Sequence, residues 1–335
     1  MISKKIIIIF CFVSILSATS MGSSLAQTVE GTENQITSNM SDQYFPDIHE
    51  DIIVWTDVRN QSSDIFLYNL TSEEETQVTT HTSEERVPHI YGEIIVWEDW
   101  RNGNWDIYMH NLSSGEESAV ITNDSDQRVP DIYEDRIVWE DLRNDNWDIY
   151  MYNMTTGEEQ QITDNASDQL YPAIYGDQIT WMDDRNGGWD IFIYNISSGE
   201  EMQITANESV SLYPDIYEDR VVYMDDRTFD QNIYMYNITT QQEMQITTND
   251  SWQVVPRIHE NRIVWTDERN ANWDIVGNSD IYMFDLTTGE EFQVSTNEER
   301  QVYPAIYGDT VVWEDRRNLN ADVFAFEITG QNSTE

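Results

Sequence analysis

The sequence predicts an all-β fold, a seven-bladed β-propeller with four antiparallel strands in each blade. Three observations predict it. A unit of 42 residues recurs along the chain, each unit holds four short runs rich in Ile, Val, Tyr and Trp, and the two chain ends together supply one complete unit. Helical periodicity is absent throughout, so we expect the runs to be strands.

Aromatic anchors mark the seven repeats. Five consecutive spacings between them are 42 residues and the last is 48. An aspartate follows each anchor by two positions and an arginine by four. The chain's seven prolines occupy the same position in each repeat. The anchors are Trp55, Trp97, Trp139, Trp181, Tyr223, Trp265 and Trp313. The pairs are Asp57 with Arg59, Asp99 with Arg101, Asp141 with Arg143, Asp183 with Arg185, Asp225 with Arg227, Asp267 with Arg269, and Asp315 with Arg317.

Four strands are expected in each unit, and residues 130–163 show them in order. The innermost lies around Asp131–Tyr133, after the proline, and the second covers Arg136–Glu140. The third covers Asp148–Asn153 and the outermost Glu159–Thr163, with turn residues between the runs. One four-stranded sheet cannot bury both faces alone, whereas blades around an axis cover one another. A linear β-solenoid is the competing architecture.

The chain ends predict how the ring closes. The last repeat stops after its third run, Val323–Phe326, and lacks a fourth. An unpaired fourth run, E-N-Q-I-T at about residues 33–37, precedes the first proline. We therefore expect this N-terminal strand to complete the C-terminal blade, which also removes open sheet edges.

Residues 1–26 are expected to be a signal peptide. Lys4 and Lys5 precede an apolar run, and Ser24 and Ala26 supply small residues before a cleavage site. The apolar run has about 11 residues, against the about 20 that span a bilayer. Residues 27–330 then form a single propeller domain and residues 331–335 a short tail. The predicted location is secreted or cell surface, without membrane insertion after cleavage.

The charge of the chain limits its partners. It has 17 Lys+Arg against 63 Asp+Glu, a formal net charge of −46, which excludes nucleic acid and anionic membrane faces. Cleavage would remove the only cysteine and the only two lysines, leaving 15 − 63 = −48. This balance is typical of proteins that work in high salt, where screening weakens self-repulsion, although ordinary acidic solubility also explains it.

Asn-x-Ser/Thr sequons are dense, so we expect an exported glycoprotein. Asn, Ser and Thr also favour turns, which is the alternative explanation. The sequon asparagines are Asn39, Asn60, Asn69, Asn111, Asn123, Asn153, Asn165, Asn195, Asn207, Asn237, Asn249 and Asn332.

The repeat resembles TolB-like (WD40-like) propeller repeats of archaeal and bacterial cell-surface proteins. The likeness rests on the proline-led first run, the D-I-Y-x-Y-N run at Asp148–Asn153, the G-E-E-x-Q-I-T run at Gly199–Thr205 and the W-E-D-x-R-N-x-N-W-D stretch at Trp97–Asp106. It covers residues 30–328. The resemblance implies the propeller fold, but no Tol function, because the domain that precedes the propeller in the Tol protein is missing.

The Asp/Arg repeat is expected to be structural. Catalysis needs one asymmetric site, so seven equal copies favour an ion pair in every blade, with the arginine bridging two aspartates. A calcium site at Asp141, Asn144, Asn146 and Asp148 is the alternative, since oxygen ligands suit Ca²⁺. Otherwise no metal or cofactor is expected.

Tryptophans in the loops are candidate ligand contacts, because aromatic rings beside Asn and Asp suit stacking on carbohydrate or peptide. Their recurrence at one position of the repeat favours the alternative, that they cap the neighbouring blade. They are Trp105, Trp147, Trp189 and Trp273.

Positions that break the repeat are further candidates. The residue after each proline should approach the channel, which selects Asp131, Asp215 and Arg257. Phe229 and Trp252 make blades 5 and 6 the most distinctive sector.

No catalytic residue is assigned, because the five histidines are scattered and neither G-x-S-x-G nor HExxH occurs. The expected function is therefore non-catalytic binding of an envelope protein or a surface polysaccharide. A carbohydrate-active enzyme, a lyase or glycosidase with its site at the channel mouth, is the alternative. A mainly structural envelope component is a third.

Overall fold

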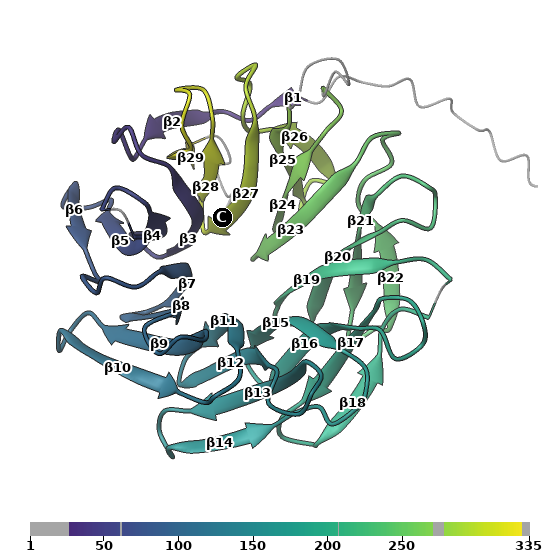
Figure 1. The fold of residues 1–335 in the computed structure, drawn as a ribbon. Coiled ribbons are helices and arrows are strands. Elements are labelled where there is room, and N and C mark those ends of the chain that lie inside the picture. Colours follow the sequence, from purple (N-terminus) through teal and green to yellow (C-terminus); the bar gives the residue numbers. More distant parts are fainter. Residues whose placement is uncertain (1–26, 61, 207, 271–277, 330–335) are drawn as a thin grey trace, which may run out of the picture.

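The computed structural model describes residues 27–60, 62–206, 208–270 and 278–329, which form seven sheets around a central axis (Figure 1). The predicted all-β, seven-bladed propeller is confirmed. No helix that could cross a lipid bilayer occurs in this part of the chain. The predicted signal peptide, residues 1–26, and tail, residues 331–335, lie outside the described residues.

Each blade runs from an inner strand at the axis to an outer strand at the rim, and blades 1 to 7 are numbered by their inner strands in chain order. The inner strands are β3 (Gln43–His49), β7 (Glu85–Tyr91), β11 (Gln127–Tyr133), β15 (Gln169–Tyr175), β19 (Ser211–Tyr217), β23 (Gln253–His259) and β27 (Gln301–Tyr307). The second strands are β4 (Ile52–Asp57), β8 (Ile94–Asp99), β12 (Arg136–Asp141), β16 (Gln178–Asp183), β20 (Arg220–Asp225), β24 (Arg262–Asp267) and β28 (Thr310–Asp315).

The third strands are β5 (Asp64–Asn69), β9 (Asp106–Asn111), β13 (Asp148–Asn153), β17 (Asp190–Asn195), β21 (Asn232–Asn237), β25 (Asp280–Asp285) and β29 (Asp322–Ile328). The outer strands are β6 (Glu74–Gln77), β10 (Glu116–Ile121), β14 (Glu158–Gln161), β18 (Glu200–Gln203), β22 (Gln242–Gln245), β26 (Glu290–Gln293) and, for blade 7, β2 (Gly31–Gln35). All pairings within these four-strand sets are antiparallel.

The core lies between blades rather than inside them. Anchor Trp97 of blade 2 is fully buried and shares a cluster with Val54 and Ile65 of blade 1. The other clusters repeat this arrangement around the ring. Because each anchor fills the space against the preceding blade, every sheet depends on its neighbours for burial.

The predicted ring closure is confirmed, because β2 pairs antiparallel with β29, with Gly31 opposite Ile328. The strand covers residues 31–35 instead of 33–37, since the N–H groups of Ile36 and Thr37 both turn to the Val323 carbonyl, at 2.9 and 3.3 Å. A strand that we did not predict, β1 (Gln27–Thr28), pairs in parallel with β26 and adds a fifth strand to blade 6.

The predicted start of the inner strands was wrong. In blade 3, the strand begins at Gln127 and passes through its proline, whereas the prediction began at Asp131. A β-bulge makes this possible, since the pairing with β12 shifts between Arg128 and Asp131. The outer strand of the same blade ends at Gln161 rather than at residue 163.

Candidate functional site

The end of the ring that carries the second-to-third-strand turns and the connections between blades is called the mouth face. Both kinds of connection lie there because the strands of a blade are antiparallel. Each inner strand starts at this face and runs along the channel. Residues at alternate positions therefore form three layers, such as Phe45, Asp47 and His49 on β3.

The first layer is built by the bulges. The residue before each proline has a φ between 47° and 54°, a region that valine and aromatic residues rarely adopt. The preceding blade holds the strained residue, since Glu98 Oε1 accepts the N–H of Val129 at 2.8 Å and Glu140 Oε2 accepts that of Tyr171 at 3.0 Å. The bulged residues are Phe45, Val87, Val129, Tyr171, Tyr213, Val255 and Tyr303.

The aromatic bulged residues give the mouth face an apolar rim. Phe45 and Tyr303 have ring centroids 5.3 Å apart, and Tyr171 and Tyr213 have centroids 5.2 Å apart. Nine large hydrophobic side chains are exposed in the described part of the chain, and all except Met244 lie on this face. The eight on the face are Met40, Phe45, Trp100, Tyr171, Phe229, Trp252, Tyr303 and Leu319.

The second layer carries charge. It consists of Asp47, His89, Asp131, Ala173, Asp215, Arg257 and Ala305. The three aspartates join neighbouring blades, because each accepts the N–H of an isoleucine on the next inner strand: Ile90 at 2.9 Å, Ile174 at 2.8 Å and Ile258 at 2.7 Å. The predicted channel position of Asp131, Asp215 and Arg257 is thus observed.

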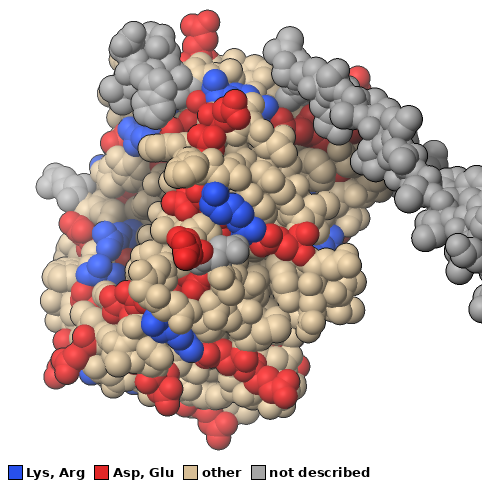
Figure 2. Space-filling model, turned by 90° about the vertical axis from the view of Figure 1, so that its right-hand side faces the viewer, with Lys and Arg blue, Asp and Glu red and all other residues tan. Residues whose placement is uncertain are grey.

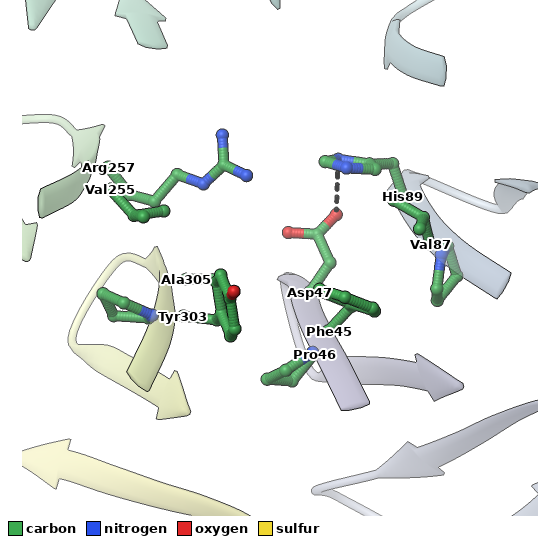
Figure 3. Close-up of a pocket in the computed structure, with 11 residues that line it drawn as sticks. Phe45, Pro46, Asp47, Val87, His89, Val255, Arg257, Tyr303 and Ala305 are labelled. Atoms are coloured by element: carbon green, nitrogen blue, oxygen red, sulfur yellow. Dashed lines mark ion pairs between the residues drawn. The ribbon is translucent and has the colours of Figure 1, made fainter. Parts of the chain in front are cut away.

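One histidine lies between two of these carboxylates. His89 Nδ1 is 3.6 Å from Asp47 Oδ2 and 3.6 Å from Asp131 Oδ1 (Figure 3 shows the first contact). Burial, followed by the charge of Arg257, lowers the pKa of His89 to about 3, so the imidazole is neutral at pH 7. Burial also raises the pKa of Asp131 to about 7, which leaves this carboxyl divided between its two protonation states at neutral pH.

The third layer is a closed belt of aromatic rings. Each ring contacts the next, with centroids 4.4 to 4.9 Å apart, in the order His49, Tyr91, Tyr133, Tyr175, Tyr217, His259, Tyr307 and back to His49. A channel cavity of about 150 Å³ lies between this belt and the charged layer. The Nδ1 atoms of His49 and His259 accept backbone N–H groups of Gly92 and Gly308, at 3.2 and 3.0 Å. Both imidazoles therefore present Nε2–H as a donor.

The Asp/Arg repeat forms an ion pair in all seven blades. In blade 3, Asp141 accepts the indole N–H of Trp139 at 3.0 Å and Arg143 at 2.5 Å. The second partner of the arginine differs from the expected one, because Arg143 binds Glu159 of the outer strand at 2.5 Å rather than a third-strand aspartate. These residues link the second strand of the blade to its outer strand, outside the channel.

In the calcium alternative, the two carboxylates are already engaged by other side chains. The amide nitrogens of Asn144 and Asn146 donate to Asp148 at 2.9 and 3.3 Å, and Asp141 is held by Arg143. Groups of three or more His, Cys, Asp or Glu side chains arranged for a metal do not occur among the residues that the structure describes.

The loop tryptophans are largely built into the fold. Trp105 is only 6% exposed, and the guanidinium carbon of Arg86 lies 3.8 Å from its ring centroid. Trp147 and Trp189 are half-buried, and Trp189 packs against a core cluster between blades 4 and 5. Trp273 lies outside the described residues. Trp105, Trp147 and Trp189 are therefore less open to a ligand than expected, whereas Phe229 and Trp252 are exposed on the mouth face.

The sequence-based site missed the aromatic rim. Its signal was the residue before each proline, which is aromatic in blades 1, 4, 5 and 7. A cavity at the mouth is lined by blades 6, 7, 1 and 2, so it shares only blade 6 with the sector expected at blades 5 and 6.

Solved structures share this fold at low sequence identity. An oligogalacturonate lyase from Vibrio parahaemolyticus matches with a TM-score of 0.68 and 10% identity, over 91% of this chain and 98% of that one. The β-propeller domain of the Trilobed protease from Pyrococcus furiosus matches with 0.66 and 13%, over 87% and 96%. A putative TolB from Agrobacterium tumefaciens matches with 0.52 and 14%, over 79% and 98%.

These likenesses agree with the expected TolB-like propeller at the level of the fold, and their differing activities select none for this chain. No family model matches the sequence, and no curated protein does.

Proposed function

We propose that this chain is a non-catalytic, exported or cell-surface propeller that binds an envelope protein or a surface polysaccharide on its mouth face. One observation carries the proposal: the exposed large hydrophobic side chains gather on that face rather than around the ring. The chain is acidic overall, and Figure 2 shows Asp and Glu residues spread among uncharged ones over one flank. Clustered exposed aromatic residues within a polar surface are typical of binding sites.

The proposal is tested by capture from a cell-envelope extract in high salt, with recovered proteins and glycans both analysed. The informative variant is Tyr171→Ala with Trp252→Ala, which removes two aromatic side chains that are 40% and 42% exposed on the mouth face. Its control is Met244→Ala, a residue 40% exposed on outer strand β22. Binding through the mouth face requires the double variant to lose the captured partner while the control keeps it. Equal capture by all three proteins would contradict the proposal.

A carbohydrate-active enzyme, a lyase or glycosidase, is the second candidate. It is favoured by the position of His89 between Asp47 and Asp131, since an imidazole between carboxyl groups can transfer a proton. The fold likeness to an oligogalacturonate lyase is compatible with it. If this candidate holds, incubation shortens the captured glycan and Asp131→Asn abolishes the shortening. If the chain only binds, the glycan is recovered intact.

A further inference from the structure

A small cavity opens at the mouth, where blades 6, 7, 1 and 2 meet. Its polar lining consists of Arg257, Asp47 and His89, and its volume is about 60 Å³. On this scale one bound water occupies about 10–15 Å³. The cavity therefore has room for about four to six waters, the space needed by a molecule of five or six non-hydrogen atoms.

The two sides of the cavity carry opposite charges. Figure 3 shows the Arg257 guanidinium on one side and the carboxylate of Asp47, with His89 behind it, on the other. Asp215 is the only acid that pairs with Arg257 within the described ranges, and its Oδ1 is 4.0 Å away. The guanidinium, which has five N–H donors, is thus only loosely engaged by the protein.

An alanine creates the gap between these charges. In the seven-membered charged layer, Ala305 stands between Arg257 and Asp47, and it lines the cavity. The other alanine of the layer, Ala173, stands between Asp131 and Asp215 and does not line it. The chain therefore contains one gap flanked by opposite charges and one flanked by like charges, which provides an internal control.

Aromatic rings enclose the cavity on the mouth side. Phe45 and Tyr303, whose centroids are 5.3 Å apart, line it together with three prolines and two valines. An ammonium group near Asp47 would also lie beside these rings, whose faces attract cations. Charge-assisted hydrogen bonds at the two ends of a walled cavity are stronger than those in open water.

We propose that this cavity binds a small zwitterion, an α-amino acid of the size of glycine or alanine. The carboxylate would pair with Arg257 and the ammonium with Asp47, across Ala305. A free anion is repelled by the neighbouring aspartates of the layer, and a free cation leaves the Arg257 guanidinium without an anionic partner. Only a molecule with both charges complements both ends. This inference concerns a small ligand and does not depend on the macromolecular partner of the proposed function.

Calorimetric titration of the purified protein with glycine and with alanine, in an amine-free buffer, tests the proposal. We expect saturable binding, and at least tenfold weaker binding of acetate, of methylamine and of glycerol. Arg257→Gln and Asp47→Asn should each weaken amino-acid binding at least tenfold. Asp145→Asn, the same change at an exposed turn residue of blade 3 that lies outside the cavity lining, should alter it less than threefold.

A second pair of variants separates loss of the site from loss of the fold. Ala305→Val should fill the cavity and abolish binding, whereas Ala173→Val, the same change at the like-charged gap, should leave it intact. The melting temperature of each variant reports folding. The proposal is overturned if folded wild-type protein binds neither amino acid, or if glycerol or acetate binds as tightly as alanine. It is equally overturned if folded Arg257→Gln or Ala305→Val protein keeps wild-type affinity.

Discussion

Arg317 donates to Glu33 at 2.5 Å, although 284 positions separate the two residues in the sequence. The bond repeats in blade 7 the pairing of Arg143 with Glu159 in blade 3. The N-terminal strand therefore supplies the same chemistry that an outer strand supplies within any other blade, and the two chain ends form one equivalent unit.

Deleting residues 27–37 should destabilise the protein severely. The deletion removes β1 and β2, unpairs β29 and uncovers Phe324 and Phe326, which are 4% and 7% exposed. We expect a loss of more than about 4 kcal/mol in the free energy of unfolding, measured by denaturant titration. Glu33→Gln, which removes only the ion pair at a partly exposed position, should cost less than about 1 kcal/mol. Similar losses in the two proteins would contradict closure by the strand itself.

Gly31→Ala should weaken the same closure. A Cβ at this position would lie 2.2 Å from the Phe326 ring and 2.3 Å from the Glu327 carbonyl oxygen. Backbone and ring must move apart, which we expect to cost about 1–3 kcal/mol. Gly188→Ala is the control, since its nearest neighbour would be the Ser209 carbonyl oxygen at 4.0 Å. Thermal unfolding followed by circular dichroism compares the variants, and an unchanged melting temperature for Gly31→Ala would rule out this tight contact.

Asp141→Asn should destabilise blade 3 more than Glu159→Gln does. Asp141 is fully buried and accepts both Trp139 and Arg143, so the change leaves donors without a charged acceptor. Breaking a buried pair of this kind costs about 3–5 kcal/mol. The Arg143–Glu159 pair lies at the surface and should contribute about 0–1 kcal/mol. Urea titrations of both variants test the order, and a larger loss from Glu159→Gln would reverse the roles assigned here.

Stability should fall as the pH rises from about 4.5 to about 8. Burial raises the pKa of Glu140 to about 8, so the folded state holds this proton more tightly than the unfolded state does. Deprotonation above the unfolded pKa therefore favours unfolding across this window. Glu140→Gln keeps an acceptor for the Tyr171 N–H and should stabilise the protein by roughly 1–3 kcal/mol at pH 8. At pH 4 the difference should vanish; a stabilisation independent of pH would point to another cause.

The ring and its closure could be predicted because they depend on periodic spacing. The regular spacing of the aromatic anchors and the unpaired fourth run near residue 33 determine the number and order of the strands without knowledge of any contact. Bulges could not be predicted in the same way. The positive φ at Val129 is accompanied by a hydrogen bond from its N–H to Glu98 of the neighbouring blade, a contact that the sequence does not reveal. A proline after such a residue normally indicates the start or the edge of a strand.

The candidate site was predictable only in part. Asp131, Asp215 and Arg257 were selected because the residue after the proline differs from one repeat to another. The structure places all three in one layer of the channel. Which of them face one another depends on how four blades meet. The gap at Ala305 follows from three inner strands taken together, so no single repeat reveals it.

Binding through the mouth face is the central claim, and hydroxyl-radical footprinting of the protein on cell-envelope material tests it most directly. We predict that Tyr171, Trp252 and Tyr303 become protected from oxidation on binding, while Met244 on the outer strand stays as reactive as in the free protein. Protection of Met244 with unchanged reactivity of the three mouth residues would contradict the claim and place the binding surface on the flank of the ring.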